Sequence, residues 1–423
     1  MREPDGTGRP LAPENTGDFR AYARDWVRQN LTRADPGAQR MVSLETDDEL
    51  RDLVARHRQI QARLYGAGLA GIRYPREYGG QGLTEDHQRA FIEETAGYEV
   101  PVQLSVTLGI LGPTLLDFGT EQQKQTHIRG MLRGDEIWVQ LLSEPSSGSD
   151  MAGVLTRAQR DGDVYMVNGS KIWTTGAHVA DYGMLLARTD PDLPKHSGLS
   201  MIITPLSSPG VTIAPIRLAT GASDFCQEFL DDVMLPLANL IGKENGGWAV
   251  ASRLLFHERN MVGGIGLSDT RTHAAPEEGA EYDMVATARR LGASDDPLAR
   301  QLIGESVMLE RLAPLAAERM SEALRAGILP GPGASLLKLL GAVTSYRQAE
   351  IGMQIAGQAA AVWPAGEAGE AGLAWLGARA ATVAGGTNEM QLNQISERVL
   401  GLPRDLSPDR DLPFSQQRHN APR

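Results

Sequence analysis

The acidic residue best placed to do chemistry is Glu258. It lies in the segment WAVASRLLFHERNMV, with Leu254 four residues before it and Met261 three residues after it. A helix here would place its carboxylate on an apolar stripe, where desolvation disfavours the charged form. The residues alone leave two interpretations open. One is a structural ion pair with Arg259 or a neighbouring chain, and the other is a general base with a raised pKa.

Two further segments could surround a bound molecule. The loop at 138–150, WVQLLSEPSSGSD, gathers Pro, Gly and Ser after a β-rich run. Its amides and hydroxyls could hold a phosphate or flavin, although an ordinary Ser/Gly turn has the same composition. The later run NGSKIWTT ends in Trp173-Thr174-Thr175, and a tryptophan there either fills the core or presents its face to a planar cofactor.

A third segment, AGGTNEMQ, combines a Gly385-Gly386 turn with Thr387 as a helix N-cap. Helix capping explains this pattern, and free amides at such a place could also stabilise an oxyanion. The sequence contains no P-loop, no Rossmann glycine fingerprint, no HExxH, and no Cys or His pair at metal-ligand spacing. A Rossmann or metal enzyme is therefore not expected, and none of the histidines is a catalytic candidate.

Composition narrows the class of partner. The formal net charge of −12 and the pI near 5.2 argue against nucleic acid as a partner. The single cysteine, Cys226, excludes an intrachain disulfide and favours a cytoplasmic protein. The first residues lack a signal-peptide core, and no run approaches the roughly 18 to 20 apolar residues of a membrane span. We therefore expect a protein that is neither exported nor membrane-spanning.

Periodicity along the chain predicts a multidomain α+β protein. Apolar residues at helical spacing follow the cap candidates Thr16 and Asp18, and Thr120 and Gln123 have capping-box spacing. Short β-rich runs separated by turn residues then predict an all-β domain, followed by helices that include one capped by Asp296. The predicted parts are a disordered 1–15, a helical domain 16–136, a β domain 137–244, a helix bundle 245–404 and a disordered tail 405–423.

Several ordered motifs resemble the acyl-CoA dehydrogenase family, in its bacterial FadE-like branch. They are YPREYGGQG, GTEQQK, SEPSSGSD, NGSKIWTT, NGGW, the Glu-Arg pair, GGTNEMQ and ERVLGLPR, and the match covers most of residues 15–404. The resemblance implies a helical domain, a β-barrel and a four-helix bundle. It also implies dimers or tetramers that bind FAD between the middle and last domains.

The resemblance also assigns the base. In many family members a glutamate immediately precedes the Gly-Thr of the last motif, but this sequence has Gly385 there. The isovaleryl-CoA dehydrogenases carry theirs on the first bundle helix, directly before an arginine, which corresponds to Glu258-Arg259. We therefore predict Glu258 as the base, with the backbone amide of Gly385 holding the thioester oxygen.

The other site residues follow from matching positions. Predicted substrate contacts are Ser149, Arg259 and Gly386. Predicted cofactor contacts are Gln140, Leu142, Ser143, Ser149, Trp173, Thr175, Arg290, Gln301, Gln354, Thr387 and Glu389.

The implied reaction is α,β-dehydrogenation of an acyl-CoA or carrier-bound acyl thioester to the trans-2-enoyl thioester, with an electron-transfer flavoprotein as acceptor. Three departures from the family pattern fall in segments that the resemblance places near FAD. The segment ARRLGASDDPLARQ replaces an Arg-x-x-Phe-Gly run, GQAA at 357–360 replaces a GGNG-like turn, and Leu392 replaces an arginine. Two alternatives therefore stand beside a self-sufficient dehydrogenase. They are a flavin-dependent oxygenase or oxidase on the same fold, and a partner subunit of a heteromeric dehydrogenase with little activity alone.

Overall fold

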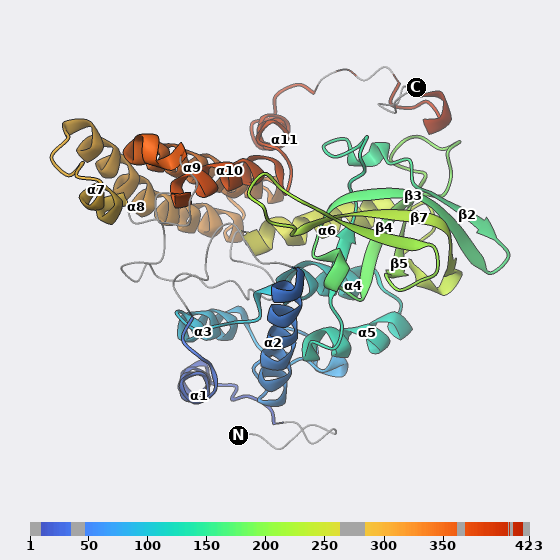
Figure 1. Cartoon of the computed structure of the whole chain (residues 1–423). Helices are drawn as coiled ribbons and strands as arrows, with labels where there is room; N and C mark the ends of the chain where they lie inside the picture. Colours follow the sequence, from blue (N-terminus) through green and yellow to red (C-terminus); the bar gives the residue numbers. More distant parts are fainter. Residues whose placement is uncertain are drawn as a thin grey trace.

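The computed structural model describes residues 10–34, 47–262, 284–361, 369–404, 406 and 409–417. Its elements follow one another as helices, then strands, then helices again. Figure 1 shows the first helices below, the sheet on the right and the last helices on the upper left. This arrangement confirms the predicted α+β fold class.

Side-chain caps fix the starts of two N-terminal helices. Asn15 is the N-cap of the first, because its side-chain oxygen accepts hydrogen bonds from the amides of residues 17 and 18. The predicted cap candidates, Thr16 and Asp18, were therefore wrong by one to three positions. The capping box of Thr120 and Gln123 is present as predicted. This group contains α1 (Thr16–Asn30), α2 (Asp47–Gly66), α3 (Glu85–Thr95), the short π-helix η4 (Thr107–Leu111), α4 (Gly112–Phe118) and α5 (Glu121–Arg133).

The strands of the middle group form one sheet in the order β6-β7-β3-β2-β4-β5-β8, with β1 parallel to β4. The long strands alternate buried and more exposed side chains, so that one face packs on an apolar core. All strands lie inside the predicted range 137–244. They are β1 (Trp138–Leu141), β2 (Arg157–Asp161), β3 (Val164–Thr175), β4 (Tyr182–Arg188), β5 (Leu199–Pro205), β6 (Val211–Ile216), β7 (Phe225–Pro236) and β8 (Leu240–Ile241).

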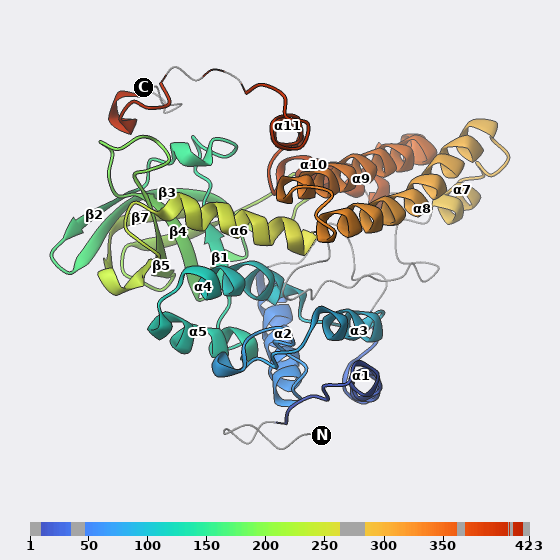
Figure 2. The same ribbon diagram turned by 180° about the vertical axis from the view of Figure 1, so that it is seen from behind.

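The last group starts with α6 (Gly247–Val262), the helix that joins the three parts. It packs against β4 and β5, against η4 and α4, and against α9. Figure 2 shows it running from the sheet toward the bundle, above α4. Asp296 caps α8 as predicted. The segment HAAPEEGAEYD at 273–283, whose composition predicts a loop, lies outside the described residues. The remaining helices are α7 (Met284–Arg290), α8 (Pro297–Arg325), α9 (Ala334–Ala356), α10 (Gly369–Val383) and α11 (Asn388–Gln394).

Short segments near both ends pack on the molecule, although we expected 1–15 and 405–423 to be disordered. The amide of Ala12 donates to Gln81 Oε1 at 3.0 Å. The ring of Phe414 is buried beneath the Arg188 guanidinium, whose central carbon lies 3.7 Å from the centroid of the ring. Proline-rich, charged sequence predicts disorder on average, but a single aromatic anchor can hold a segment in place.

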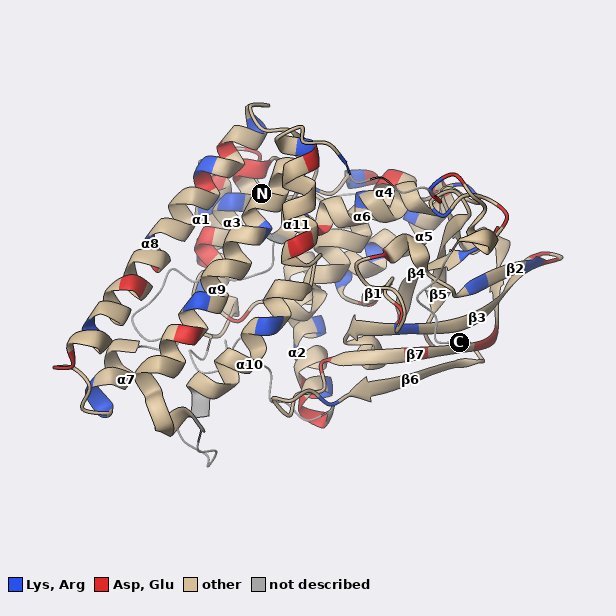
Figure 3. Ribbon diagram, turned by 90° about the horizontal axis from the view of Figure 1, so that it is seen from above, with Lys and Arg blue, Asp and Glu red and all other residues tan. Residues whose placement is uncertain are grey.

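Charges of both signs are interspersed over the described helices in the view of Figure 3. Some are paired across helices, such as Arg347 of α9 with Glu305 of α8, whose Nε and Oε1 lie 2.6 Å apart. That face shows no continuous basic stripe among the described residues.

Candidate active site

Glu258 lies on α6 with its carboxylate on an apolar face, as predicted. Leu254, one turn before it, is fully buried, and Met261 is 8% exposed. Gln140 of β1 donates from Nε2 to Glu258 Oε2 at 3.1 Å. The sheet therefore orients one carboxylate oxygen of a helix from the next domain.

The turn before α11 meets the same carboxylate from the bundle side. Gly385 and Gly386 have φ angles of 67° and 91°, in the left-handed region that favours glycine. A Cβ atom built on Gly385 would lie 2.9 Å from Glu258 Oε1, closer than an unstrained contact permits. The two positions at which the family resemblance places a base therefore face one point in space.

The electrostatic surroundings of Glu258 suit a base. Burial raises the pKa of its carboxyl group above the ordinary value, while the Gln140 hydrogen bond and the charges of Arg259 and Lys338 act in the opposite direction. A carboxylate of raised pKa accepts a proton more readily. In this environment burial outweighs the charge of Arg259.

A buried ion pair holds the loop that follows β1. Lys171 of β3 is fully buried and donates to Glu144 Oε1 at 2.8 Å and to the Leu142 carbonyl at 3.0 Å. The Glu144 carboxylate also accepts hydrogen bonds from the backbone amides of residues 155–156. Burial alone would raise the pKa of Glu144, but the Lys171 charge and these hydrogen bonds outweigh it and lower the pKa. Ser143 is thus held between two anchored residues.

A β-bulge turns the Trp173 side chain out of the sheet. The register of β3 against β7 shifts between Ile172 and Thr174, and Trp173 adopts a φ of 67°. Its side chain is 54% exposed, so it does not fill the core. The Ile172 amide donates to the Ser143 carbonyl at 3.0 Å, which places the loop beside the bulge. Thr175, the last residue of β3, is also exposed.

Helix α11 begins directly after the 385–386 turn. Thr387 is its N-cap as predicted, accepting the Met390 amide at 3.2 Å. Gln391 Nε2 donates to the carbonyls of both turn glycines, at 3.1 and 3.2 Å. Two buried oxygens at this site, Asn388 Oδ1 and Gln391 Oε1, have no hydrogen-bond donor among the described residues. They can therefore accept hydrogen bonds from a bound molecule.

The three predicted substrate contacts come from different elements. Gly386 lies in the turn beside Glu258, and Ser149 lies on the exposed part of the loop after β1. Arg259 points into a groove of about 430 Å³ on the other side of α6. The imidazole of His257 also turns away from Glu258, with Nε2 2.8 Å from Asp117 Oδ2. The groove is lined by Phe118, Ala249, Ser252, Arg253, Phe256, Arg259, Gly331, Pro332, Ser335 and Gln394.

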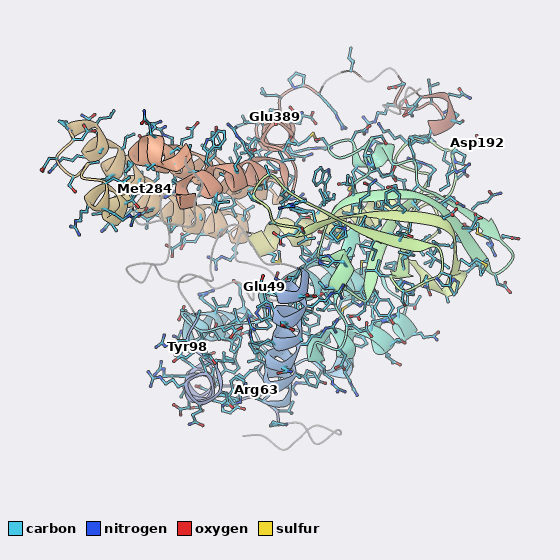
Figure 4. All side chains as sticks on the ribbon, viewed as in Figure 1. Glu49, Arg63, Tyr98, Asp192, Met284 and Glu389 are labelled. Atoms are coloured by element: carbon cyan, nitrogen blue, oxygen red, sulfur yellow. The ribbon has the colours of Figure 1, made fainter. Side chains whose placement is uncertain are left out.

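Three predicted cofactor contacts, Arg290, Gln301 and Gln354, lie at the opposite end of the bundle. All three are exposed. Figure 4 labels Met284, the first residue of α7, at that end and Glu389 on α11, much nearer the sheet. Their helices share a small core of Ala288, Leu302, Ile351 and Ile355. Figures 1 and 2 show α7 at the end of the bundle away from the sheet to which β3 belongs.

The side of the site around Trp173 fits a flavin. An exposed indole offers a flat surface for a planar ring, and the backbone of the Ser143 loop is hydrogen-bonded to Ile172, next to Trp173 in β3. The donor-free oxygens of Asn388 and Gln391 match a ligand rich in hydroxyl donors. This chain can thus supply a surface that faces a flavin ring.

Sequence reasoning missed the supporting residues Lys171, Glu144, Gln391 and Lys338. For Lys171 a signal existed, because it continues the alternation that buries Tyr165 and Val167 in β3. A lysine at a buried strand position needs a partner. No comparable local signal marks Gln391, whose role depends on the shape of the preceding turn.

No described helix is long and apolar enough to cross a membrane. Within the same described residues, no three His, Cys, Asp or Glu side chains are arranged to hold a metal ion. Cys226 is buried, with its sulfur 3.0 Å from His178 Nδ1.

Comparisons with known proteins agree with this architecture. Three family models match in order: the acyl-CoA dehydrogenase N-terminal domain at 14–135, the middle domain at 140–233 and the C-terminal domain at 245–400. The acyl-CoA dehydrogenase IpdE1 of Mycobacterium tuberculosis is 35% identical over 395 residues, covering 93% of this chain and 99% of that protein.

Solved structures give the same result. The Tcur3481-Tcur3483 steroid ACAD superposes with a TM-score of 0.73 at 29% identity, covering 93% of this chain and 99% of its own. The ChsE4-ChsE5 complex from Mycobacterium tuberculosis superposes with a TM-score of 0.67 at 26% identity, covering 94% of this chain and all of its own. Since the motifs, the order of domains and the relatives agree, this chain belongs to the acyl-CoA dehydrogenase family, whose members are flavoprotein oxidoreductases.

Proposed function

We propose that the chain dehydrogenates an acyl-CoA thioester between its α and β carbons, with Glu258 as the base and FAD as the cofactor. The observation that carries this proposal is the 2.9 Å separation between Glu258 Oε1 and the Cβ position of Gly385. An α proton of a thioester is weakly acidic, so its removal needs a carboxylate and a hydrogen bond to the developing oxyanion. Here the carboxylate and a backbone turn lie side by side.

Each residue has a defined part in this reaction. Glu258 Oε1 takes the α proton, while the Gln140 amide holds Oε2 and so fixes the plane of the carboxylate. The Gly385 backbone amide donates a hydrogen bond to the thioester oxygen. Gln391 holds the turn in place, because its Nε2 donates to the Gly385 carbonyl. When bound, FAD would accept the hydride that leaves the β carbon.

The cofactor site is completed by a second chain of the same architecture. Arg290, Gln301 and Gln354 come from three helices that pack on one another at the end of the bundle away from the sheet (Figures 1 and 2), and we infer that in an assembled enzyme they contact the cofactor of a neighbouring subunit. Two similar structures are titled as pairs of different chains, Tcur3481-Tcur3483 and ChsE4-ChsE5. We infer an assembly with a related partner subunit, and an electron-transfer flavoprotein as the acceptor.

The substrate proposed here is a bulky, ring-bearing acyl-CoA of the steroid kind. Support comes from the structures titled steroid ACAD, which are 29% and 30% identical to this chain over more than nine tenths of its length. A panel of CoA thioesters that contrasts ring-bearing acyl groups with straight chains of similar size tests this choice. Faster turnover of the straight chains would refute it.

Replacing Glu258 by glutamine tests the base. We expect Glu258→Gln to lower kcat about 10² to 10⁴-fold, because the amide cannot accept the α proton, while FAD stays bound. The measurement is anaerobic bleaching of the flavin absorbance by the thioester, in the assembled enzyme. Glu318→Gln, on the exposed surface of α8, is the matched control and should bleach at the parental rate. Near-parental turnover by Glu258→Gln would refute the assignment.

A further inference from the structure

Lys338 of α9 is a buried cation beside the candidate base. It is 8% exposed, and its Nζ donates to the Ala381 carbonyl at 2.8 Å. A buried ammonium group is costly unless polar or charged groups compensate it. A neutral carbonyl satisfies one of its three donors, so the electrostatic compensation has to come from charges nearby.

The lysine and the base approach the same glycine. The Cβ position of Gly385 is 2.9 Å from Glu258 Oε1 and 3.9 Å from Lys338 Cε. The carboxylate thus reaches the turn from α6 and the lysine stem reaches it from α9. Neither side chain needs to move to influence the other through space.

The hydrogen bond of Lys338 also fixes the end of α10. Ala381 lies in the last turn of that helix, where carbonyls lack partners within the helix. A cation is favourable there because it complements the negative end of the helix dipole. Four residues later the chain reaches Gly385, so this contact determines where the turn lies relative to Glu258.

We propose that Lys338 is a positioning residue for the base: it anchors the C-terminal end of α10, so that Gly385 faces Glu258, and its positive charge stabilises the Glu258 carboxylate. This inference rests on the proposed role of Glu258. The other groups around that carboxylate are Arg259 on its own helix, Gln140 from β1 and, beyond Lys338, Glu389 from α11.

The test is the pH profile of kcat/KM for the assembled holoenzyme carrying Lys338→Met. At low pH, kcat/KM falls as the Glu258 carboxylate becomes protonated, and this part of the profile is the acid limb. Losing the positive charge makes the Glu258 carboxyl group harder to ionise, so the midpoint of the acid limb should move to a pH about one unit higher. Below the limb the rate should fall about tenfold beyond the pH-independent loss that the released turn causes, and well above the limb only that pH-independent loss should remain. A limb at the parental pH with a uniform loss of rate would leave Lys338 with only a structural role and overturn the proposal.

Two more variants separate charge from anchoring. Lys338→Arg keeps the positive charge and a hydrogen-bond donor, so its acid limb should lie at the parental pH. Lys338→Gln keeps a donor without the charge, so it should shift the limb while leaving hydrogen exchange at 384–391 slow. Lys338→Met should both shift the limb and speed that exchange. Lys243→Met, at an exposed lysine, is the control and should change neither.

The outcomes also distinguish this inference from the proposed function. If Glu258→Gln retains turnover, the assignment of the base fails whatever Lys338 does. If Glu258→Gln is inactive and both neutral Lys338 variants keep the parental limb, only the role of Lys338 fails. If Lys338→Met loses bound flavin, or if its circular dichroism spectrum shows that it is unfolded, the pH of the acid limb is measured with Lys338→Gln instead. A shifted limb in that variant supports the proposal and an unshifted one overturns it.

Discussion

At the scale of single residues, the site depends on a glycine that leaves room for a carboxylate from another helix. A side chain at 385 would be strained by a φ of 67° and would meet Glu258 Oε1. Gly385→Glu alone should therefore lower stability by about 1–3 kcal/mol and reduce turnover.

Moving the carboxylate gives a sharper prediction. In the double variant Glu258→Gly with Gly385→Glu, the new side chain starts at the point that Glu258 Oε1 now approaches. We expect it to recover at least about tenfold over Glu258→Gly, because a base returns to nearly the same place. Steady-state kinetics with one thioester measures this. Equal rates for the single and double variants would contradict the geometry.

Trp173 predicts opposite changes in stability and cofactor binding. Its φ of 67° is costly for a large side chain, and its ring makes little use of the core. Trp173→Gly should leave the thermal midpoint of the flavin-free protein unchanged or higher, by the equivalent of about 1 kcal/mol. Flavin content after purification should fall severalfold, because the flat surface is lost. A large drop in the midpoint of the flavin-free protein would show that the indole serves the fold instead.

At the scale of elements, the sequence predicted what depends on local pattern. The apolar stripe around Glu258 predicted α6, and cap residues such as Thr387 predicted where helices begin. The bulge at Trp173 could not be read, because it arises from a register shift against β7, far along the chain. The contact of Gln140 with Glu258 was also hidden, since it joins a strand to a helix from another domain.

Strand β7 carries a buried acid that makes stability depend on pH. Glu228 is fully buried and accepts a hydrogen bond from the Thr174 hydroxyl at 2.8 Å, and burial raises its pKa to about 7. The unfolded chain releases this proton near the ordinary pKa, whereas the folded protein keeps it to about 7. The free energy of unfolding should therefore fall as the pH rises between these two values and change little above them.

Glu228→Gln removes this titration. Its free energy of unfolding should match that of the parent near pH 4 and exceed it increasingly up to pH 7, by at most about 3 kcal/mol. Thermal unfolding followed by circular dichroism at several pH values measures the difference. A constant offset between the two proteins at every pH would rule out this role for Glu228, and Glu318→Gln serves as the surface control.

At the scale of the whole molecule, the proposed cofactor site is shared between chains, because α7, which carries Arg290, lies at the end of the bundle away from the sheet that carries Trp173 (Figures 1 and 2). If copies of this chain complete one another, mixing Glu258→Gln with Arg290→Ala chains should create some sites free of both changes. About a quarter of the parental activity should then return, although each variant alone is nearly inactive. If the partner is a different subunit, mixing restores nothing, and adding that subunit raises the flavin absorbance of this chain instead. Flavin content and activity that are independent of assembly would contradict the shared site.

The meeting of Glu258 with Gly385 also bears on how such enzymes diverge. Two codons far apart in the gene encode residues that meet at one place, where a side chain at 385 would crowd the Glu258 carboxylate. A lineage that transfers the acid from one codon to the other must pass through an ancestor with none or with two crowded together. Duplicated genes whose products assemble as pairs offer a natural route, because one copy can sustain catalysis while its sister crosses the gap.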